Sequence, residues 1–215
     1  MSIFANRDLI IYIRFMNLVF ATNNRHKLEE ISNLLGDSFN LVSLAETGLA
    51  EDIPEDYPTL EENALFKAKY IHGLSGMNVF ADDTGLEIDA LGGRPGVHSA
   101  RFAGPGKDFD ANIDKVLSLL GNNPNRKARF RTIIALILNR KEYMFEGRVE
   151  GMIIRERRGE KGFGYDPVFV PDGSELTFAE ISMDEKNKIS HRAMAFLKLK
   201  SFLSEYGKTH NIDQQ

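Results

Sequence analysis

The sequence predicts a mixed α/β fold, an α/β or α+β protein with a long mixed central sheet and flanking helices. Two observations predict it. In the first half of the chain, short apolar strand segments alternate with amphipathic helices, as in βα units. In the second half, two long strand candidates are joined by a short link, as in an antiparallel hairpin. We expect a ligand in a cleft between the mostly parallel lobe and the hairpin lobe.

The composition is that of an ordinary globular protein. The chain has 215 residues, of which 42% are hydrophobic and 27% charged, and this length fits one domain. It contains no cysteine, which excludes disulfides, thiolate metal sites and cysteine nucleophiles and is compatible with a reducing cytoplasm. The net charge of −4 argues against a protein that grips long nucleic acid, because such proteins usually carry a basic excess.

The first fifteen residues are interpreted as an extension. Their apolar run, at 9–13, is too short to span a bilayer, and no small-residue cleavage site of a signal peptide follows it. Met16 then opens a natural first strand. We therefore expect an N-terminal extension at 1–15, one two-lobed domain at 16–207 and a C-terminal tail at 208–215, with no membrane segment.

The elements of the first half follow from apolar runs, which predict strands, and from apolar residues at helical spacing, which predict helices. In order, they are a strand at 18–21, a helix at 25–35, a strand at 41–44, a polar loop at 45–59, a helix at 60–74 and a strand at 78–81 that ends in an Asp-Asp turn.

The second half begins with a dense glycine and proline turn. Its elements are the turn at 92–96, a helix at 108–120, strands at 128–138 and 143–157 joined by the link 139–142, a glycine-rich loop at 159–165 and a strand at 168–170. Ser182 and Glu185 match a capping box, and Ser190 is placed to cap the last helix.

Two adjacent carboxylates, Asp82 and Asp83, stand at the expected end of the strand at 78–81. Like charges this close disfavour each other unless a positive group neutralises them. Such a pair can hold a hard cation such as Mg²⁺ or activate a water. The alternative is purely structural, because Asp and Gly are the residues that dominate turns.

Six polar residues lie between the first strand and the first helix: Thr22, Asn23, Asn24, Arg25, His26 and Lys27. Free backbone N–H groups and the helix dipole favour an anion at this place, and an asparagine-capped helix with a solvated basic face is the alternative. Further along, Glu55 is a candidate oxygen ligand. Asn63 and Lys67 share one helical face, and surface decoration is the alternative there.

The remaining candidates lie near the C-terminus. Glycines alternate with aromatic residues in Phe163-Gly164-Tyr165-Asp166, which suits a flat ring against the backbone. The alternative is a tight loop whose aromatic side chains pack into the core. Lys186, His191 and Arg192 place cations and donors at the start of the last helix, where His191 alone would more often be structural.

Jointly, these motifs resemble the inosine triphosphate pyrophosphatase family, whose members hydrolyse non-standard purine triphosphates such as dITP and XTP. The resemblance extends from about residue 18 to residue 203. The residues that carry it are Thr22-Asn23-Asn24-x-x-Lys27, Glu55, Glu62-Asn63-Ala64-x-x-Lys67-Ala68, Ala81-Asp82-Asp83-Thr84-Gly85-Leu86, Gly92-Gly93-x-Pro95-Gly96-Val97-x-Ser99-Ala100-Arg101, Gly162-Phe163-Gly164-Tyr165-Asp166-Pro167 and Glu185-Lys186-Asn187-x-Ile189-Ser190-His191-Arg192.

The resemblance implies two lobes around a nucleotide-binding cleft, a homodimer, and hydrolysis of ITP, dITP and XTP to the monophosphate and pyrophosphate, which clears deaminated purines. It implies Asp83 as proton acceptor and Mg²⁺ held by Glu55 and Asp83, with Asp82 completing the metal shell. The substrate-binding residues it implies are Thr22 to Lys27, Lys67, Thr84, Phe163, Gly164, Tyr165, Asp166, Lys186, His191 and Arg192.

The chain departs from the family pattern at three places. Asn23 stands where many members have Gly, Thr84 where Ser is frequent, and Pro54 where an acidic residue is frequent. Three competing functions stay open: a pyrophosphatase for modified pyrimidines or standard nucleotides, a non-catalytic nucleotide sensor, and a nucleic-acid-binding module, which the acidic balance disfavours.

Overall fold

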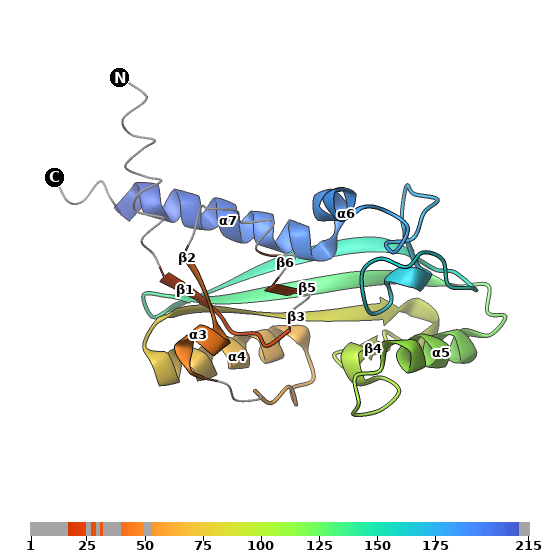
Figure 1. Ribbon diagram of the computed structural model, residues 1–215, viewed down its shortest axis with the longest axis horizontal. Coiled ribbons are helices and arrows are strands. Elements are labelled where there is room, and N and C mark those ends of the chain that lie inside the picture. Colours follow the sequence, from red (N-terminus) through yellow and green to blue (C-terminus); the bar gives the residue numbers. More distant parts are fainter. Residues whose placement is uncertain (1–16, 25–26, 29–30, 32–39, 50–52, 211–215) are drawn as a thin grey trace, which may run out of the picture.

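One mixed sheet runs the length of the molecule (Figure 1). The computed structural model describes residues 17–24, 27–28, 31, 40–49 and 53–210. Within these, seven strands pair in the order β2-β1-β3-β5-β6-β7, and β4 pairs with β3. The strands are β1 (Asn17–Phe20), β2 (Asn40–Ser43), β3 (Asn78–Ile88), β4 (Pro95–Gly96), β5 (Lys127–Leu138), β6 (Lys141–Ile153) and β7 (Phe169–Pro171). β1 is parallel to β2 and β3, and all other pairs are antiparallel, so the predicted mixed α/β fold is confirmed.

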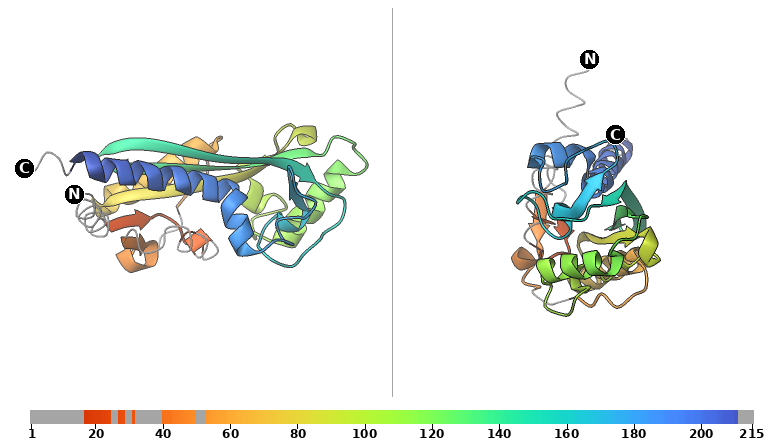
Figure 2. Two further views of the ribbon diagram at one scale, coloured as in Figure 1. Left: turned by 90° about the horizontal axis from the view of Figure 1, so that it is seen from above. Right: turned by 90° about the vertical axis from the view of Figure 1, so that its right-hand side faces the viewer.

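Helices cover both faces of this sheet (Figures 1 and 2). The described helices are α3 (Leu44–Thr47), α4 (Leu60–Ser75), α5 (Phe109–Leu120), α6 (Met183–Ile189) and α7 (His191–His210), with 3₁₀ turns η2 (Asp89–Leu91), η3 (Ser99–Arg101) and η4 (Asp166–Val168). α7 lies along one face, and α4 lies on the other. Within the described ranges, none of the helices combines the length and the apolar composition that a membrane span requires.

Alternation along the central strands divides the core between the two faces. Ile134 and Leu136 of β5 pack in the α7 layer, whereas Ile133 and Ala135 pack in the α4 layer, as the two-residue period of a strand requires. Phe80 of β3 belongs to the α7 layer. Its ring stacks on that of Phe20 with centroids 4.5 Å apart.

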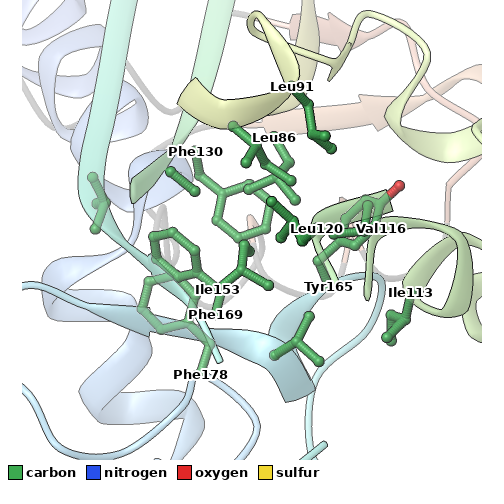
Figure 3. Close-up of a cluster of buried hydrophobic side chains, with 14 of the residues drawn as sticks. Leu86, Leu91, Ile113, Val116, Leu120, Phe130, Ile153, Tyr165, Phe169 and Phe178 are labelled. Carbon is green, nitrogen blue, oxygen red and sulfur yellow. The ribbon is translucent and has the colours of Figure 1, made fainter. Parts of the chain in front are cut away.

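A third cluster closes the far end of the sheet, around β4 and α5 (Figure 3). It joins side chains from β3, β5, β6, β7 and α5, and Phe130, Phe169 and Phe178 form its aromatic centre. This cluster holds one end of the molecule, and the two layers under α7 and α4 hold the other.

The sequence-based prediction of an Asp-Asp turn after residue 81 is wrong. β3 continues through Asp82 and Asp83 to Ile88, and both aspartates are paired in register with residues of β5. The strand tolerates them because each contacts cations from other segments. Gly85 lets β4 approach, since a Cβ there would lie 2.7 Å from the carbonyl oxygen of Gly96. Tertiary charge pairing therefore overrides the local turn preference.

Smaller differences follow from local chemistry. The expected loop at 45–59 contains α3, which a capping box between Ser43 and Glu46 begins. β6 ends at Ile153 rather than at residue 157. The hairpin turn consists of two residues, Asn139 and Arg140, with φ values of 49° and 65°, which suit the twist of the strands.

The remaining expected elements agree with the structure within a few residues. α4, α5 and the α6 capping box are confirmed, and Ser190 accepts a hydrogen bond from the Ala193 N–H at the start of α7. Of the expected helix at 25–35, residues 27, 28 and 31 are helical, and the rest lies outside the described residues, as does the extension at 1–15. α7 continues to His210, beyond the expected domain end at 207.

Candidate active site

A cleft of about 430 Å³ lies between the polar turn after β1 and the glycine-rich loop before β7, a size in the range of small-molecule sites. Most predicted site residues line it: Thr22, Asn23, Asn24, Lys27, Glu55, Lys67, Asp83, Thr84, Phe163, Gly164, Tyr165, Asp166, Lys186, His191 and Arg192. Arg25 and His26 lie outside the described residues. Asp82 is absent from the lining and lies behind the cleft wall.

Lys67 joins the two predicted metal ligands. Its ammonium nitrogen lies 2.8 Å from Oε1 of Glu55 and 3.2 Å from Oδ1 of Asp83. Burial lowers the pKa of Lys67, but the carboxylates around it outweigh burial, so the pKa lies above its usual value. The two acidic groups therefore converge in space, as expected for a shared site, and the cation between them is Lys67.

The two carboxylate oxygens of Asp83 differ in their hydrogen bonding. Oδ1 accepts from Lys67, whereas Oδ2 is buried and has no hydrogen-bond partner among the atoms of the described residues. Burial raises the pKa of Asp83, and the nearby carboxylates of Glu55 and Asp82 add to this rise, against the opposing effect of Lys67 and Lys27. Asp83 lines the cleft, and a carboxylate oxygen without a partner among the described residues is suited to accept a proton or to bind a cation.

The turn after β1 is capped as an asparagine-started helix. Oδ1 of Asn24 accepts from the Lys27 N–H at 3.3 Å, and the Asn24 N–H donates to Oγ1 of Thr22 at 3.2 Å. The asparagine-capped start of the helix is therefore present, and the same residues, Thr22, Asn24 and Lys27, line the cleft, which is compatible with the predicted anion site. Capping fixes the turn, and the fixed turn places the Lys27 side chain.

Asp82 neutralises this end of the cleft from behind. Its side chain is 0% exposed, and each of its oxygens lies 2.9 Å from Nζ of Lys27. Burial raises the pKa of Asp82, but Lys27, Arg192 and Lys67 outweigh it, so the pKa lies below its usual value. Because Asp82 is fully paired inside the protein and does not reach the cleft, its geometry does not favour the predicted role as a metal ligand.

The glycine-rich loop divides its aromatic residues between the cleft and the core. Phe163 is half-buried at the cleft, and its ring lies 6.0 Å from that of Phe109. Tyr165 belongs to the core cluster in Figure 3, and its hydroxyl donates to the Ser99 carbonyl at 3.0 Å. Tyr165 therefore packs into the core while it also lines the cleft wall, and the half-buried Phe163 is the more exposed ring for a flat ligand to contact.

A buried ion pair supports that loop. Nζ of Lys186 donates to Oδ2 of Asp166 at 2.7 Å, and the same oxygen accepts from the Phe163 N–H at 2.8 Å. The ammonium also lies 5.2 Å from the centroid of the Phe163 ring, within cation–π range. Gly162 is required here, because its φ is 75° and a Cβ would lie 2.1 Å from the same Asp166 oxygen.

His191 is a neutral side chain in this setting. Its ring stacks on Phe130 with centroids 4.6 Å apart, and Nδ1 has no hydrogen-bond partner among the described residues. Burial lowers the pKa of His191 well below its usual value, and the cations Arg192 and Lys186 add to this effect. The imidazole can therefore serve the cleft as a hydrogen-bonding group and not as a charge.

Sequence reasoning missed several lining residues, notably Arg101, Lys107 and Phe109. Arg101 lies within a quoted motif, yet its contact with Oε2 of Glu55 at 3.5 Å depends on η3 folding back over the cleft. Phe109 begins α5, where its hydrophobicity fits a helix face equally well. No local pattern distinguishes these roles, so only the fold assigns them.

A divalent cation fits this site with few protein ligands. Among the described residues, no three acidic or histidine side chains cluster as a metal site. Glu55 and Asp83 nevertheless converge, and Oδ2 of Asp83 is buried and unpartnered within the described part of the chain. Mg²⁺ typically takes one or two carboxylates and completes its shell with water and phosphate oxygens, so this donor set is compatible with it.

Comparison with known proteins identifies the family. The Ham1 family matches residues 18–202. A dITP/XTP pyrophosphatase of Porphyromonas gingivalis is 54% identical over 187 residues, which cover 86% of this chain and 96% of that protein. A dITP/XTP pyrophosphatase of Christiangramia forsetii is 49% identical over 190 residues, covering 88% and 100%. The structure of a HAM1 protein from Coxiella burnetii superimposes with a TM-score of 0.83 at 38% identity, covering 89% of this chain and 100% of that one. From its fold, its cleft and these relatives, the chain belongs to the Ham1 family.

Proposed function

We propose that this protein hydrolyses non-standard purine nucleoside triphosphates, ITP, dITP and XTP, to the nucleoside monophosphate and pyrophosphate. This activity removes deaminated purines before a polymerase incorporates them. The relatives named dITP/XTP pyrophosphatase, which match almost over their full length, support the proposal. The observation that carries it is the convergence of Glu55 and Asp83 on Lys67 in the wall of a cleft.

We propose Mg²⁺ as the cofactor, held by the carboxylates of Glu55 and Asp83. When bound, Mg²⁺ would supply positive charge that offsets the negative charge developing on the phosphate oxygens. Asp83 comes from β3 and Glu55 from the loop before α4, and the contacts of both with Lys67 support this assignment. The Lys67 ammonium between them holds the two carboxylates together.

Asp83 is the proposed proton acceptor. A water oxygen attacks a phosphorus atom of the α–β anhydride, the bond from phosphorus to the bridging oxygen breaks, and the water proton passes to Asp83 while pyrophosphate leaves. The unpartnered Oδ2 and the raised pKa of Asp83 suit this role, because a base works best when its pKa approaches the working pH. Lys27 and Lys67 stabilise the charge on the transferring and leaving phosphates.

Base choice is proposed to occur at the other end of the cleft. The purine lies against Phe163, near the donors Lys186 and Arg192 and the neutral ring of His191. Hypoxanthine and xanthine present an oxygen at C6, whereas adenine presents an amine. When adenine enters a site rich in hydrogen-bond donors, its C6 amine faces another donor and no hydrogen bond forms. Buried mismatches of this kind discriminate strongly between adenine and the oxo purines.

A product assay tests the proposal. ITP, XTP, dTTP and ATP are incubated at equal concentration, with and without Mg²⁺, and phosphate and pyrophosphate are measured separately. We expect pyrophosphate from ITP and XTP in Mg²⁺ and little from ATP or dTTP. Pyrophosphate from dTTP or ATP at equal rates would favour a different pyrophosphatase, and tight binding of ITP without product would favour a sensor.

The assembly and the place of action are part of the same proposal. We propose a homodimer, which light scattering at several protein concentrations tests directly, and a monomer mass at all concentrations would contradict it. We propose the cytoplasm as the place of action, because the nucleotide pool that polymerases draw on lies there. The acidic net charge of −4 is consistent with a small-molecule substrate and not with nucleic acid as a partner.

A further inference from the structure

Asp82 is the one member of the proposed metal shell whose surroundings fit another role. It follows Ala81 and precedes Asp83 on β3, and neighbouring residues of a strand point to opposite faces. Asp83 pairs in register with Ile133, on the α4 face, and Asp82 with Ile134, on the α7 face. The Asp82 side chain is 0% exposed and takes no part in lining the cleft.

Three residues that do line the cleft contact Asp82, and they come from three parts of the chain. Lys27, after β1, places Nζ 2.9 Å from each carboxylate oxygen. Thr84 donates its hydroxyl to Oδ2 at 3.2 Å. Arg192, in the first turn of α7, places Nε 4.0 Å from the same oxygen. The buried Asp82 carboxylate thus contacts residues along the whole site: Lys27 at the end proposed for the phosphates, Thr84 in the middle and Arg192 at the end proposed for the base.

The charges explain why a carboxylate is needed at this point. Lys27 and Arg192 are both cations, with side chains only 13% and 3% exposed. Without the Asp82 carboxylate, the Lys27 and Arg192 cations would lie near each other with no negative charge between them. Their mutual repulsion is costly in such a poorly solvated setting. The lowest-energy response is for the more exposed side chain, Lys27, to swing toward solvent and leave the phosphate site.

We propose that Asp82 is a positioning residue that holds Lys27, Thr84 and Arg192 in their binding arrangement, and that it does not ligate the metal. The inference rests on the proposed function for its substrate and is tested by readouts that do not all require turnover. The two adjacent carboxylates then have different roles. Asp83 acts on metal and water, whereas Asp82 orders the cations that meet the nucleotide.

The test compares Asp82→Asn, Lys27→Met and the double variant, with Asp83→Asn as the control for metal binding. Mn²⁺ affinity is measured by calorimetry without nucleotide, and kcat and KM are measured with ITP. We expect Asp82→Asn to lower kcat/KM by about 10- to 100-fold, the range for residues that orient a functional group, mainly through KM. Its Mn²⁺ affinity should equal that of the unmodified protein, whereas Asp83→Asn should weaken Mn²⁺ binding.

The double variant separates positioning from a general structural effect. If Asp82 acts by positioning Lys27 together with Thr84 and Arg192, Asp82→Asn should lower kcat/KM clearly less in the Lys27→Met background than in the unmodified protein, because one of its three partners is already gone. Should Asp82→Asn alone fail to fold, judged by circular dichroism, the double variant gives the same comparison without an unpaired buried cation at residue 27. Independent, multiplicative losses would overturn the inference, and so would a loss of Mn²⁺ affinity matching that of Asp83→Asn.

Binding of inorganic tripolyphosphate distinguishes a failure of the inference from a failure of the proposed function. This probe needs neither turnover nor a base. Asp82→Asn should bind it about tenfold more weakly than the unmodified protein does, a loss in the range expected when an orienting residue is removed. Equal affinity would overturn the inference. Absence of pyrophosphate release from ITP would contradict the proposed function and leave this comparison intact.

Discussion

Replacing Gly147 by alanine should weaken the fold and the site together. Gly147 lies in β6, directly under the first turn of α7. A Cβ there would lie 1.9 Å from the His191 carbonyl oxygen and 2.5 Å from the Ala195 N–H nitrogen. Both atoms belong to helix backbone, so no side chain can rotate away. The strand and the helix touch through a glycine because nothing larger fits.

The size of the effect follows from these distances. An ordinary contact begins at 3.4 Å, so the start of α7 must retreat by roughly 1–1.5 Å to relieve both contacts, a typical response to overpacking. Phe196, Leu199 and Leu203 of α7 are 0–1% exposed and lose packing as it moves. Overpacking of this kind costs about 1–3 kcal/mol, which corresponds to a fall in melting temperature of roughly 2–12 °C for a chain of this length.

The same movement should reduce activity, because His191 and Arg192 sit on the displaced turn. A misplacement of about 1 Å at a binding site can cost on the order of 10²-fold in rate. Melting temperature is measured by calorimetry, and kcat/KM with ITP by pyrophosphate release. We expect both to fall in Gly147→Ala.

Gly73→Ala is the matched control. It makes the same chemical change inside α4, where a Cβ enters open space, and there alanine should stabilise the helix by about 0.5–1 kcal/mol. Its activity should be unchanged. If Gly147→Ala melted at the same temperature as the unmodified protein, or if both variants shifted in the same direction, the packing argument would be refuted.

Three further predictions concern the site itself. Gly162→Ala should raise the KM for ITP by about 10- to 100-fold, because the added Cβ displaces the Asp166 carboxylate that holds the loop; unchanged KM would contradict this. Asp166→Ala should lower the free energy of unfolding in urea by about 3–5 kcal/mol, because it leaves the Lys186 ammonium buried without its carboxylate; a loss below about 1 kcal/mol would mean that the pair behaves as a solvated one. Because the pKa of Asp83 is raised on folding, the folded state takes up its proton at higher pH than the unfolded chain, and stability falls as pH rises through that range. Metal-free Asp83→Asn should therefore melt no lower than the metal-free unmodified protein at pH 7 while losing turnover, and a clearly lower melting temperature would contradict the direction of this pKa shift.

Most of the scaffold was predictable because its elements carry their own periodicity. α4 and α5 each have one apolar face and a side-chain N-cap, at Thr59 and Asp108. The hairpin of β5 and β6 shows long runs of strand-forming residues. These patterns are local, and local chemistry decides them. The order of the motifs along the sequence then identified most of the residues that line the cleft.

What the sequence could not supply are pairings between distant segments. The capping box of α3 is local and could have been found, but the contact of Arg101 with Glu55 at 3.5 Å requires η3 to return over the cleft. Likewise, nothing in the sequence of the glycine-rich loop shows that Tyr165 is buried in the core while Phe163 stays half-buried at the cleft. The neighbours of each ring decide this, and those neighbours come from β3, α5 and α6.

The wrong prediction at Asp82 and Asp83 bears most directly on mechanism. In a turn, both carboxylates would face solvent in similar surroundings. In a strand, they face opposite sides of the sheet, and their pKa values move in opposite directions: that of Asp83 is raised and that of Asp82 lowered. Pairs of carboxylates separated in this way divide acid–base roles. The Asp83 side chain is 11% exposed at the cleft, and its Oδ2 has no hydrogen-bond partner among the described residues, which supports the proposal that it exchanges protons. Asp82, enclosed by Lys27 and Arg192, keeps its charge, as its proposed positioning role requires. The continuation of β3 is therefore what gives two identical neighbours different surroundings.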